Sequence, residues 1–73
     1  DMHITYKKLW KILIDRDMKR QDLQKLANIS ASSVAKLGKC ENVTTEVLIK
    51  ICQALKVDLS DIMELVEDDS VRE

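Results

Sequence analysis

The chain has 73 residues, of which 34% are charged, with one glycine and no proline. A chain of this length forms one small domain at most, and its composition favours a compact all-α bundle. It has no run of about 20 apolar residues, so we exclude a membrane span and expect a cytoplasmic protein.

The net charge of −1 conceals a marked asymmetry along the chain. Residues 1–56 carry eleven lysines and arginines against six acidic residues, a balance of +5. Residues 57–73 carry one arginine against seven acidic residues, a balance of −6. Basic residues neutralise phosphate groups, so the first part is a candidate for nucleic-acid binding. We divide the chain into a domain over residues 1–66 and an acidic tail over residues 67–73, which we expect to be disordered because it can bury almost nothing.

The sequence offers little support for an enzyme. It has no glycine-rich phosphate loop, no nucleophile elbow and no cluster of metal-ligating residues. Cys40 and Cys52 do not have the CxxC spacing, so we interpret them as reduced structural thiols. A bundle of this size has scarcely enough volume for a substrate cavity, and we expect no cofactor, no metal and no small-molecule ligand.

The first predicted element is a helix over about residues 6–16, which follows a frayed end at residues 1–4. Thr5 is the candidate N-cap of this helix. Apolar residues at helical spacing define its buried side: Tyr6, Leu9, Trp10 and Leu13. Lysines populate its other side, where they can face either solvent or phosphate.

Two short helices joined by a tight turn form the centre of the prediction. The first runs over about Arg20–Ala27, and Asn28 is the turn residue because asparagine tolerates a left-handed backbone. Ser30 is the candidate N-cap of the second helix, which runs over about Ala31–Leu37, and Gly38 ends it. Apolar residues of both helices are expected to face the core: Leu23, Leu26, Ala27, Val34 and Leu37.

The outer side of the second helix carries small or cationic residues. A helix with a narrow buried edge and such an outer side suits the major groove of DNA. Lys36 can donate to guanine O6 and N7, and Ala31 can contact a thymine methyl group. Ser32 and Ser33 can bond to a base edge or to phosphate. These four residues are the candidate base readers.

Two further helices complete the predicted bundle. Thr44 is the N-cap of a helix over about Thr45–Leu55, which has a wide apolar face. Ser60 caps a last short helix over about Asp61–Val66. With the three preceding helices, the sequence predicts five in all.

This arrangement resembles the helix-turn-helix of the Cro/CI-like (XRE) family of transcriptional regulators, over roughly residues 5–65. Asn28 stands where the family usually has glycine, and Gln24 where it usually has a small residue. The matching residues are Asp22-Leu23, Leu26-Ala27, Ile29-Ser30, Ser32-Ser33-Val34, Lys36-Leu37 and Asn42-Val43-Thr44. The resemblance implies a compact five-helix bundle of the phage-repressor DNA-binding domain type.

The resemblance also implies partners and a function. Arg20, Lys39 and Asn42 are expected beside the DNA phosphates, and a homodimer is expected to form through the C-terminal helix and the loop before it. The implied function is a sequence-specific regulator that binds double-stranded DNA, as a small repressor or autoregulator. The alternative is a protein-binding module such as an antitoxin or adaptor, with the acidic tail as its interaction segment.

Overall fold

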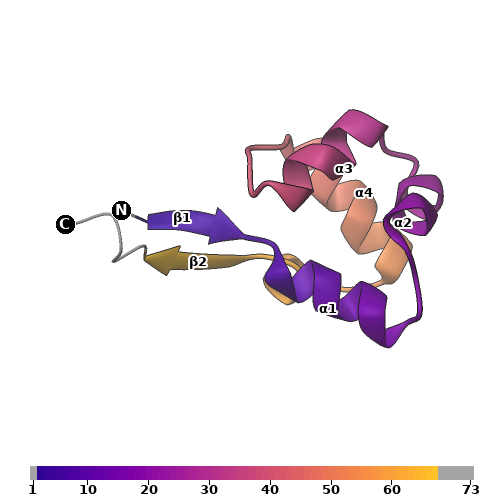
Figure 1. Ribbon diagram of the computed structural model, residues 1–73, viewed down its shortest axis with the longest axis horizontal. Coiled ribbons are helices and arrows are strands. Elements are labelled where there is room, and N and C mark those ends of the chain that lie inside the picture. The colour runs from indigo at the N-terminus through magenta and orange to yellow at the C-terminus, as the bar shows by residue number, and fades with distance from the viewer. Residues whose placement is uncertain (1, 68–73) are drawn as a thin grey trace.

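The computed structural model describes residues 2–67 of the chain and contains four α-helices, a short 3-10 helix and a two-stranded sheet. The elements follow one another as β1 (Met2–Thr5), α1 (Lys7–Asp15), α2 (Arg20–Ala27), α3 (Ala31–Gly38), α4 (Thr45–Leu55), η1 (Leu59–Asp61) and β2 (Glu64–Glu67). The four helices form one body, and the sheet projects from it as a ribbon (Figure 1).

The helix-turn-helix has the local geometry that the sequence predicts. Asn28 adopts the left-handed conformation, with φ 57° and ψ 50°, and its backbone N–H donates to the Gln24 carbonyl. At the start of α2, the Lys19 N–H donates to the Asp22 carboxylate over 2.9 Å. The turn residue and both ends of α2 are therefore confirmed.

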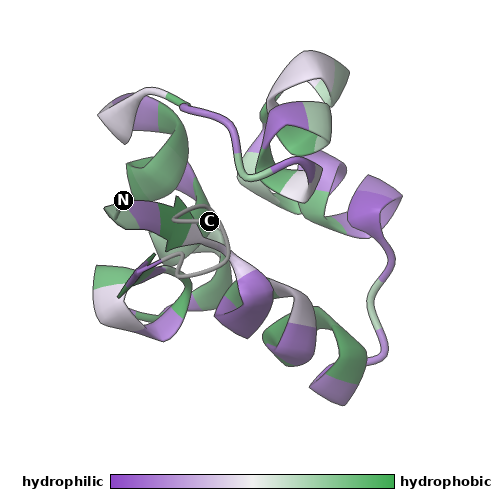
Figure 2. Ribbon diagram, turned by 60° about the vertical axis from the view of Figure 1, so that its left-hand side comes forward, coloured by the Kyte–Doolittle hydropathy of each residue, from purple (hydrophilic) through white to green (hydrophobic). Residues whose placement is uncertain are grey.

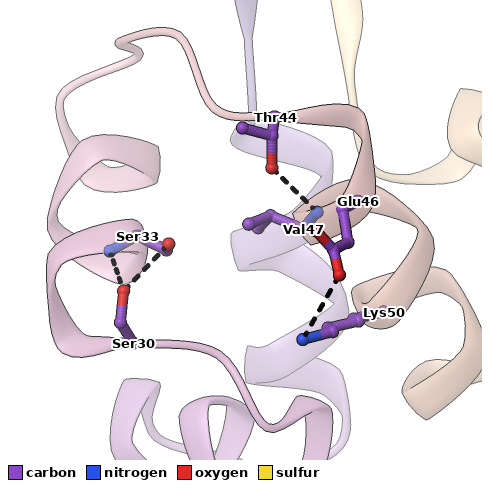
Figure 3. A network of polar contacts seen from close by, with 6 residues as sticks. All are labelled: Ser30, Ser33, Thr44, Glu46, Val47 and Lys50. Carbon is purple, nitrogen blue, oxygen red and sulfur yellow. Dashed lines mark hydrogen bonds and ion pairs between the residues drawn. The ribbon is translucent and has the colours of Figure 1, made fainter.

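Side-chain caps fix the first turns of α3 and α4, as Figure 3 shows. The Ser33 N–H donates to Ser30 Oγ over 3.1 Å, and the Val47 N–H donates to Thr44 Oγ1 over 3.3 Å. Each bond satisfies one of the backbone donors that a helix leaves free at its N-terminus. The predicted N-caps Ser30 and Thr44 are confirmed.

The core lies where the apolar sides of the helices meet. Figure 2 shows apolar and polar residues alternating along the helices, as amphipathic helices require. Six side chains are almost wholly inaccessible to solvent: Leu9, Leu23, Leu37, Ile51, Leu55 and Ile62. They come from all four helices and from the residue after η1, so the orientation of each helix depends on the others.

Two basic side chains connect α1 to the C-terminal part of the chain. Arg16 Nη1 donates to the Leu55 carbonyl over 2.9 Å, which satisfies an acceptor at the C-terminus of α4. Lys8 Nζ donates to the Ser60 carbonyl over 3.1 Å. Lys8 thus has a structural contact in the folded chain, in addition to the charge that made it a candidate for phosphate binding.

The prediction of an all-α fold with five helices is wrong at both ends of the chain. Residues 2–5 form β1 instead of a frayed end, and residues 64–67 form β2 instead of the end of a fifth helix. The strands are antiparallel, with Met2 opposite Glu67 and Ile4 opposite Leu65. Strands of four residues are too short to show a reliable alternation, and each is stabilised by a partner from the other end of the chain.

Four smaller expectations are also wrong. Ser60 does not cap a helix but lies within η1, whose N-cap is Asp58. Thr5 lies in β1 and is buried, and α1 begins after Tyr6 without a side-chain cap. Gly38 does not end α3 by a positive φ, because the helix includes it and the left-handed residue is Cys40, with φ 58°. Leu26 does not join the core but is 56% exposed. Glu67, the first residue of the predicted acidic tail, is the last residue of β2, and residues 68–73 lie outside the described residues.

Candidate nucleic-acid interface

The α3 helix contacts the body of the protein through a narrow edge. Val34 is 7% exposed and Leu37 is fully buried. On the outer side, Ala31, Ser32 and Lys36 are all exposed. Three of the four candidate base readers therefore lie on the exposed side of α3.

Ser33, the fourth candidate, has a different environment. It is half-buried, and its hydroxyl lies 3.0 Å from Ser30 Oγ (Figure 3). Its backbone N–H is already used in the cap of α3. A hydroxyl both donates and accepts, so Ser33 Oγ retains hydrogen-bonding capacity beyond its contact with Ser30.

An open cleft of about 320 Å³ separates α3 from the start of α4. Its lining combines two candidate base readers and a candidate phosphate contact with three residues that the sequence analysis did not assign to DNA binding. The lining residues are Ser33, Lys36, Asn42, Val43, Thr44 and Val47. Thr44 could have been identified from its N-cap pattern, because a helix N-terminus carries partial positive charge. The lysine and the helix end together favour an anionic group here.

The loop between α3 and α4 carries the two candidate phosphate residues Lys39 and Asn42, both exposed. Backbone hydrogen bonds hold this loop against the end of α3: the Glu41 N–H donates to the Lys36 carbonyl over 2.8 Å. Cys40, also exposed, has its Sγ 4.0 Å from Thr5 Oγ1 of β1. The loop is therefore positioned by α3 on one side and by the ribbon on the other.

Arg20 begins α2, and its side chain, although exposed, contacts two other helices. The centre of its guanidinium lies 4.4 Å from the Trp10 ring centroid, within the range of a cation–π interaction. The same group reaches the end of α3, because a Cβ built on Gly38 would lie 2.7 Å from Arg20 Nη1. No local sequence pattern indicates this contact, which joins residues from three helices.

Within residues 2–67, no group of three or more potential ligand residues could hold a metal ion. No helix in that same range has the length and apolar character needed to cross a membrane. The exposed side of α3 carries small, hydroxyl-bearing and cationic side chains.

Comparison with known proteins agrees with this geometry. Residues 8–68 match the family model of the Cro/C1-type HTH DNA-binding domain. The chain is also similar to a crystal structure of the transcriptional regulator VanUg, with 49% sequence identity and a TM-score of 0.87. That similarity covers 92% of this chain and 89% of the other. No match was found among curated proteins.

Proposed function

The chain belongs to the family of Cro/C1-type helix-turn-helix DNA-binding domains, and on that premise we propose that it is a sequence-specific transcriptional regulator. It binds an operator in double-stranded DNA as a homodimer and acts in the cytoplasm as a small repressor or autoregulator. The DNA-binding unit extends through Glu67, which pairs with Met2 in the ribbon, and the residues after it carry the acidic tail.

The observation that carries this proposal is the position of α3. The helix is held by Val34 and Leu37 and exposes Ala31, Ser32 and Lys36 beside a cleft. The major groove of DNA admits a helix presented in this way. No cofactor is required for such recognition.

In the proposed complex, base reading falls to α3. Lys36 donates to guanine O6 or N7, Ser32 and Ser33 bond to base edges or to neighbouring phosphates, and Ala31 contacts a thymine methyl group. This is a sparse set of contacts, so a single copy discriminates weakly between sequences. A symmetric dimer doubles the contacts and places two α3 helices about 34 Å apart, in successive major grooves.

Phosphate binding falls to residues around α3. Lys39 and Asn42 lie in the exposed loop after α3, and Arg20 lies at the N-terminus of α2. Cationic and amide side chains bind phosphate without regard to sequence and make affinity depend on salt. The excess of acidic residues after position 56 is consistent with a part of the chain that does not face DNA.

The test is fluorescence anisotropy with labelled duplexes at several salt concentrations. One duplex carries the DNA upstream of the gene for this protein, and the control carries the same bases scrambled. Tighter binding to the upstream duplex, with a steep salt dependence on both, supports a regulator. Equal and weak binding to both contradicts sequence-specific recognition and favours the protein-binding alternative, which a pull-down then examines.

A further inference from the structure

The β1–β2 ribbon is little stabilised by the rest of a single copy of this chain. It projects from the helical body (Figure 1), and only Thr5 among its eight residues is buried. A two-stranded sheet is marginally stable in water unless further strands or helices cover it. Within residues 2–67, neither strand has a second strand on its other edge.

One face of the ribbon is apolar and accessible. The strand register places Ile4 opposite Leu65 and Met2 opposite Glu67, so three apolar side chains share this face with the Glu67 carboxylate at its outer corner. Met2 is 59% exposed and Leu65 is 60% exposed. The ribbon thus combines open backbone edges with large apolar side chains, the two features that favour pairing with another strand.

The two edges differ in charge. Acidic residues lie at both ends of β2, Glu64 and Glu67, whereas residues 2–5 of β1 contain no acidic or basic residue other than His3. Charged residues on an edge strand oppose pairing with another chain. Antiparallel pairing of β2 with its own copy would bring four carboxylates into one short overlap, which is unfavourable. The β1 edge has no such protection.

We propose that β1 pairs antiparallel with β1 of a second copy, which produces a four-stranded sheet of order β2-β1-β1-β2 across the dimer. A symmetric antiparallel pair places one residue opposite its own copy. If His3 is the central residue, Met2 lies opposite the partner's Ile4. If Ile4 is the central residue, the two Ile4 side chains lie opposite each other. In either register the apolar faces become continuous, and the glutamates lie on the outer edges.

This interface differs from the dimer interface that the family resemblance implied, which involved the C-terminal helix and the loop before it. The biological role of the ribbon dimer rests on the proposed function, because the dimer would be the form that binds the operator. It leaves the exposed side of α3 free, because none of Ala31, Ser32 and Lys36 belongs to the ribbon. The Cys40 side chain contacts the end of β1, so the loop that carries Lys39 and Asn42 is attached to the strand that would pair.

Sedimentation velocity of the full chain over a range of concentrations tests the proposal. We expect a dimer, and we expect Met2→Lys to raise its dissociation constant by at least about tenfold, since it places a charge on the strand that pairs, opposite the partner's Ile4 in one of the two registers. Ile14→Lys is the matched control, because Ile14 is 74% exposed on α1, outside the ribbon. It should leave the dissociation constant unchanged. A chain that stays monomeric, or an equal loss in the control, overturns the proposal.

A second variant identifies the edge. The double substitution Glu64→Gln and Glu67→Gln leaves association unchanged if β1 pairs with β1, and strengthens it if β2 pairs with β2. Tighter association of this variant therefore contradicts the β1 interface. DNA binding is measured on the same samples: a monomer that binds its operator refutes only the interface, and a ribbon-dependent dimer without DNA affinity refutes only the proposed function.

Discussion

The guanidinium of Arg20 lies 4.4 Å from the centroid of the Trp10 ring, so the first residue of α2 is fixed against α1. It also reaches Gly38, in the last turn of α3. The C-terminal end of a helix carries partial negative charge, which favours a cation there. An exposed cation is therefore held in a defined position beside the proposed recognition helix.

Arg20→Ala should weaken binding to operator and scrambled DNA by the same factor. The reason is that a phosphate contact contributes affinity without sequence information, and its loss should reduce the slope of log affinity against log salt by about 1. Anisotropy titrations at several salt concentrations measure both quantities. A loss confined to operator DNA would contradict a phosphate role.

Lys56→Asn is the matched control for this charge loss. Lys56 is the C-cap of α4, at the other end of the helix from Thr44 and the cleft, so it should not reach DNA. Asparagine tolerates the left-handed backbone of this position. This variant should leave both the affinity and the salt slope unchanged.

Gly38→Ala tests the close approach of Arg20 to α3. The added Cβ would meet Arg20 Nη1, so the flexible arginine side chain should move away from Trp10. Alanine in place of a helical glycine stabilises by about 1 kcal/mol, and a lost cation–π contact costs about 0.5–1 kcal/mol. We expect little net change in unfolding free energy but a changed emission of Trp10, the single tryptophan. Unchanged emission, with Arg20→Ala as the reference, would show that the contact does not form in solution.

Lys36→Ala should weaken binding to the operator more than binding to scrambled DNA. Lys36 is exposed on the outer side of α3, where a specific base contact contributes about 1–3 kcal/mol of discrimination. The ratio of the two dissociation constants, measured at one salt concentration, should fall by about tenfold or more. An equal loss on both duplexes would assign Lys36 to phosphate binding instead.

The features of this fold that the sequence predicts correctly are those set by residues close to one another along the chain. Ser30, Thr44 and Asn28 act on the backbone within a few positions of themselves, so their patterns alone indicate the ends of α2, α3 and α4. The ribbon could not be predicted, because Ile4 and Leu65 come from opposite ends of the chain and neither short segment specifies a strand by itself.

The candidate site shows the same division between local and long-range information. The exposure of Ser32 and Lys36 follows from the helical period of α3, and the structure agrees with it. The cleft beside Asn42 and the contact of Arg20 with Trp10 depend on how separate helices pack, which no local pattern encodes. Contact of the individual residues with DNA stays a prediction.

Lys56→Gly should stabilise the protein by about 0.5–1 kcal/mol, because a non-glycine residue in the left-handed region costs about 1 kcal/mol or more. Lys56 has φ 59° at the end of α4. Asn28→Gly is the matched comparison, since asparagine already tolerates its φ of 57°, and it should change the stability less. Urea denaturation of both variants measures the difference. A larger gain for Asn28→Gly would contradict this explanation.

Stability should fall as the pH rises above about 9, because two buried or half-buried groups resist ionisation in the folded chain. Burial, and secondarily the charges of Asp58 and Asp61, raise the pKa of Cys52 above its ordinary value of 9.0. Burial, and secondarily Cys40, raise the pKa of Tyr6 above 10.0. In the unfolded chain both groups lose their protons at lower pH, so the unfolded state binds fewer protons and gains relative stability as the pH rises.

Single variants separate the two contributions. Relative to the wild type, Cys52→Ala should reduce the fall in unfolding free energy that begins near pH 9, and Tyr6→Phe should reduce the further fall that begins near pH 10. Each comparison cancels the contributions that the variant shares with the wild type. Urea denaturation from neutral pH upwards gives the two curves. If Tyr6→Phe retains the full wild-type slope above pH 10, burial of the Tyr6 hydroxyl is not the cause of the fall.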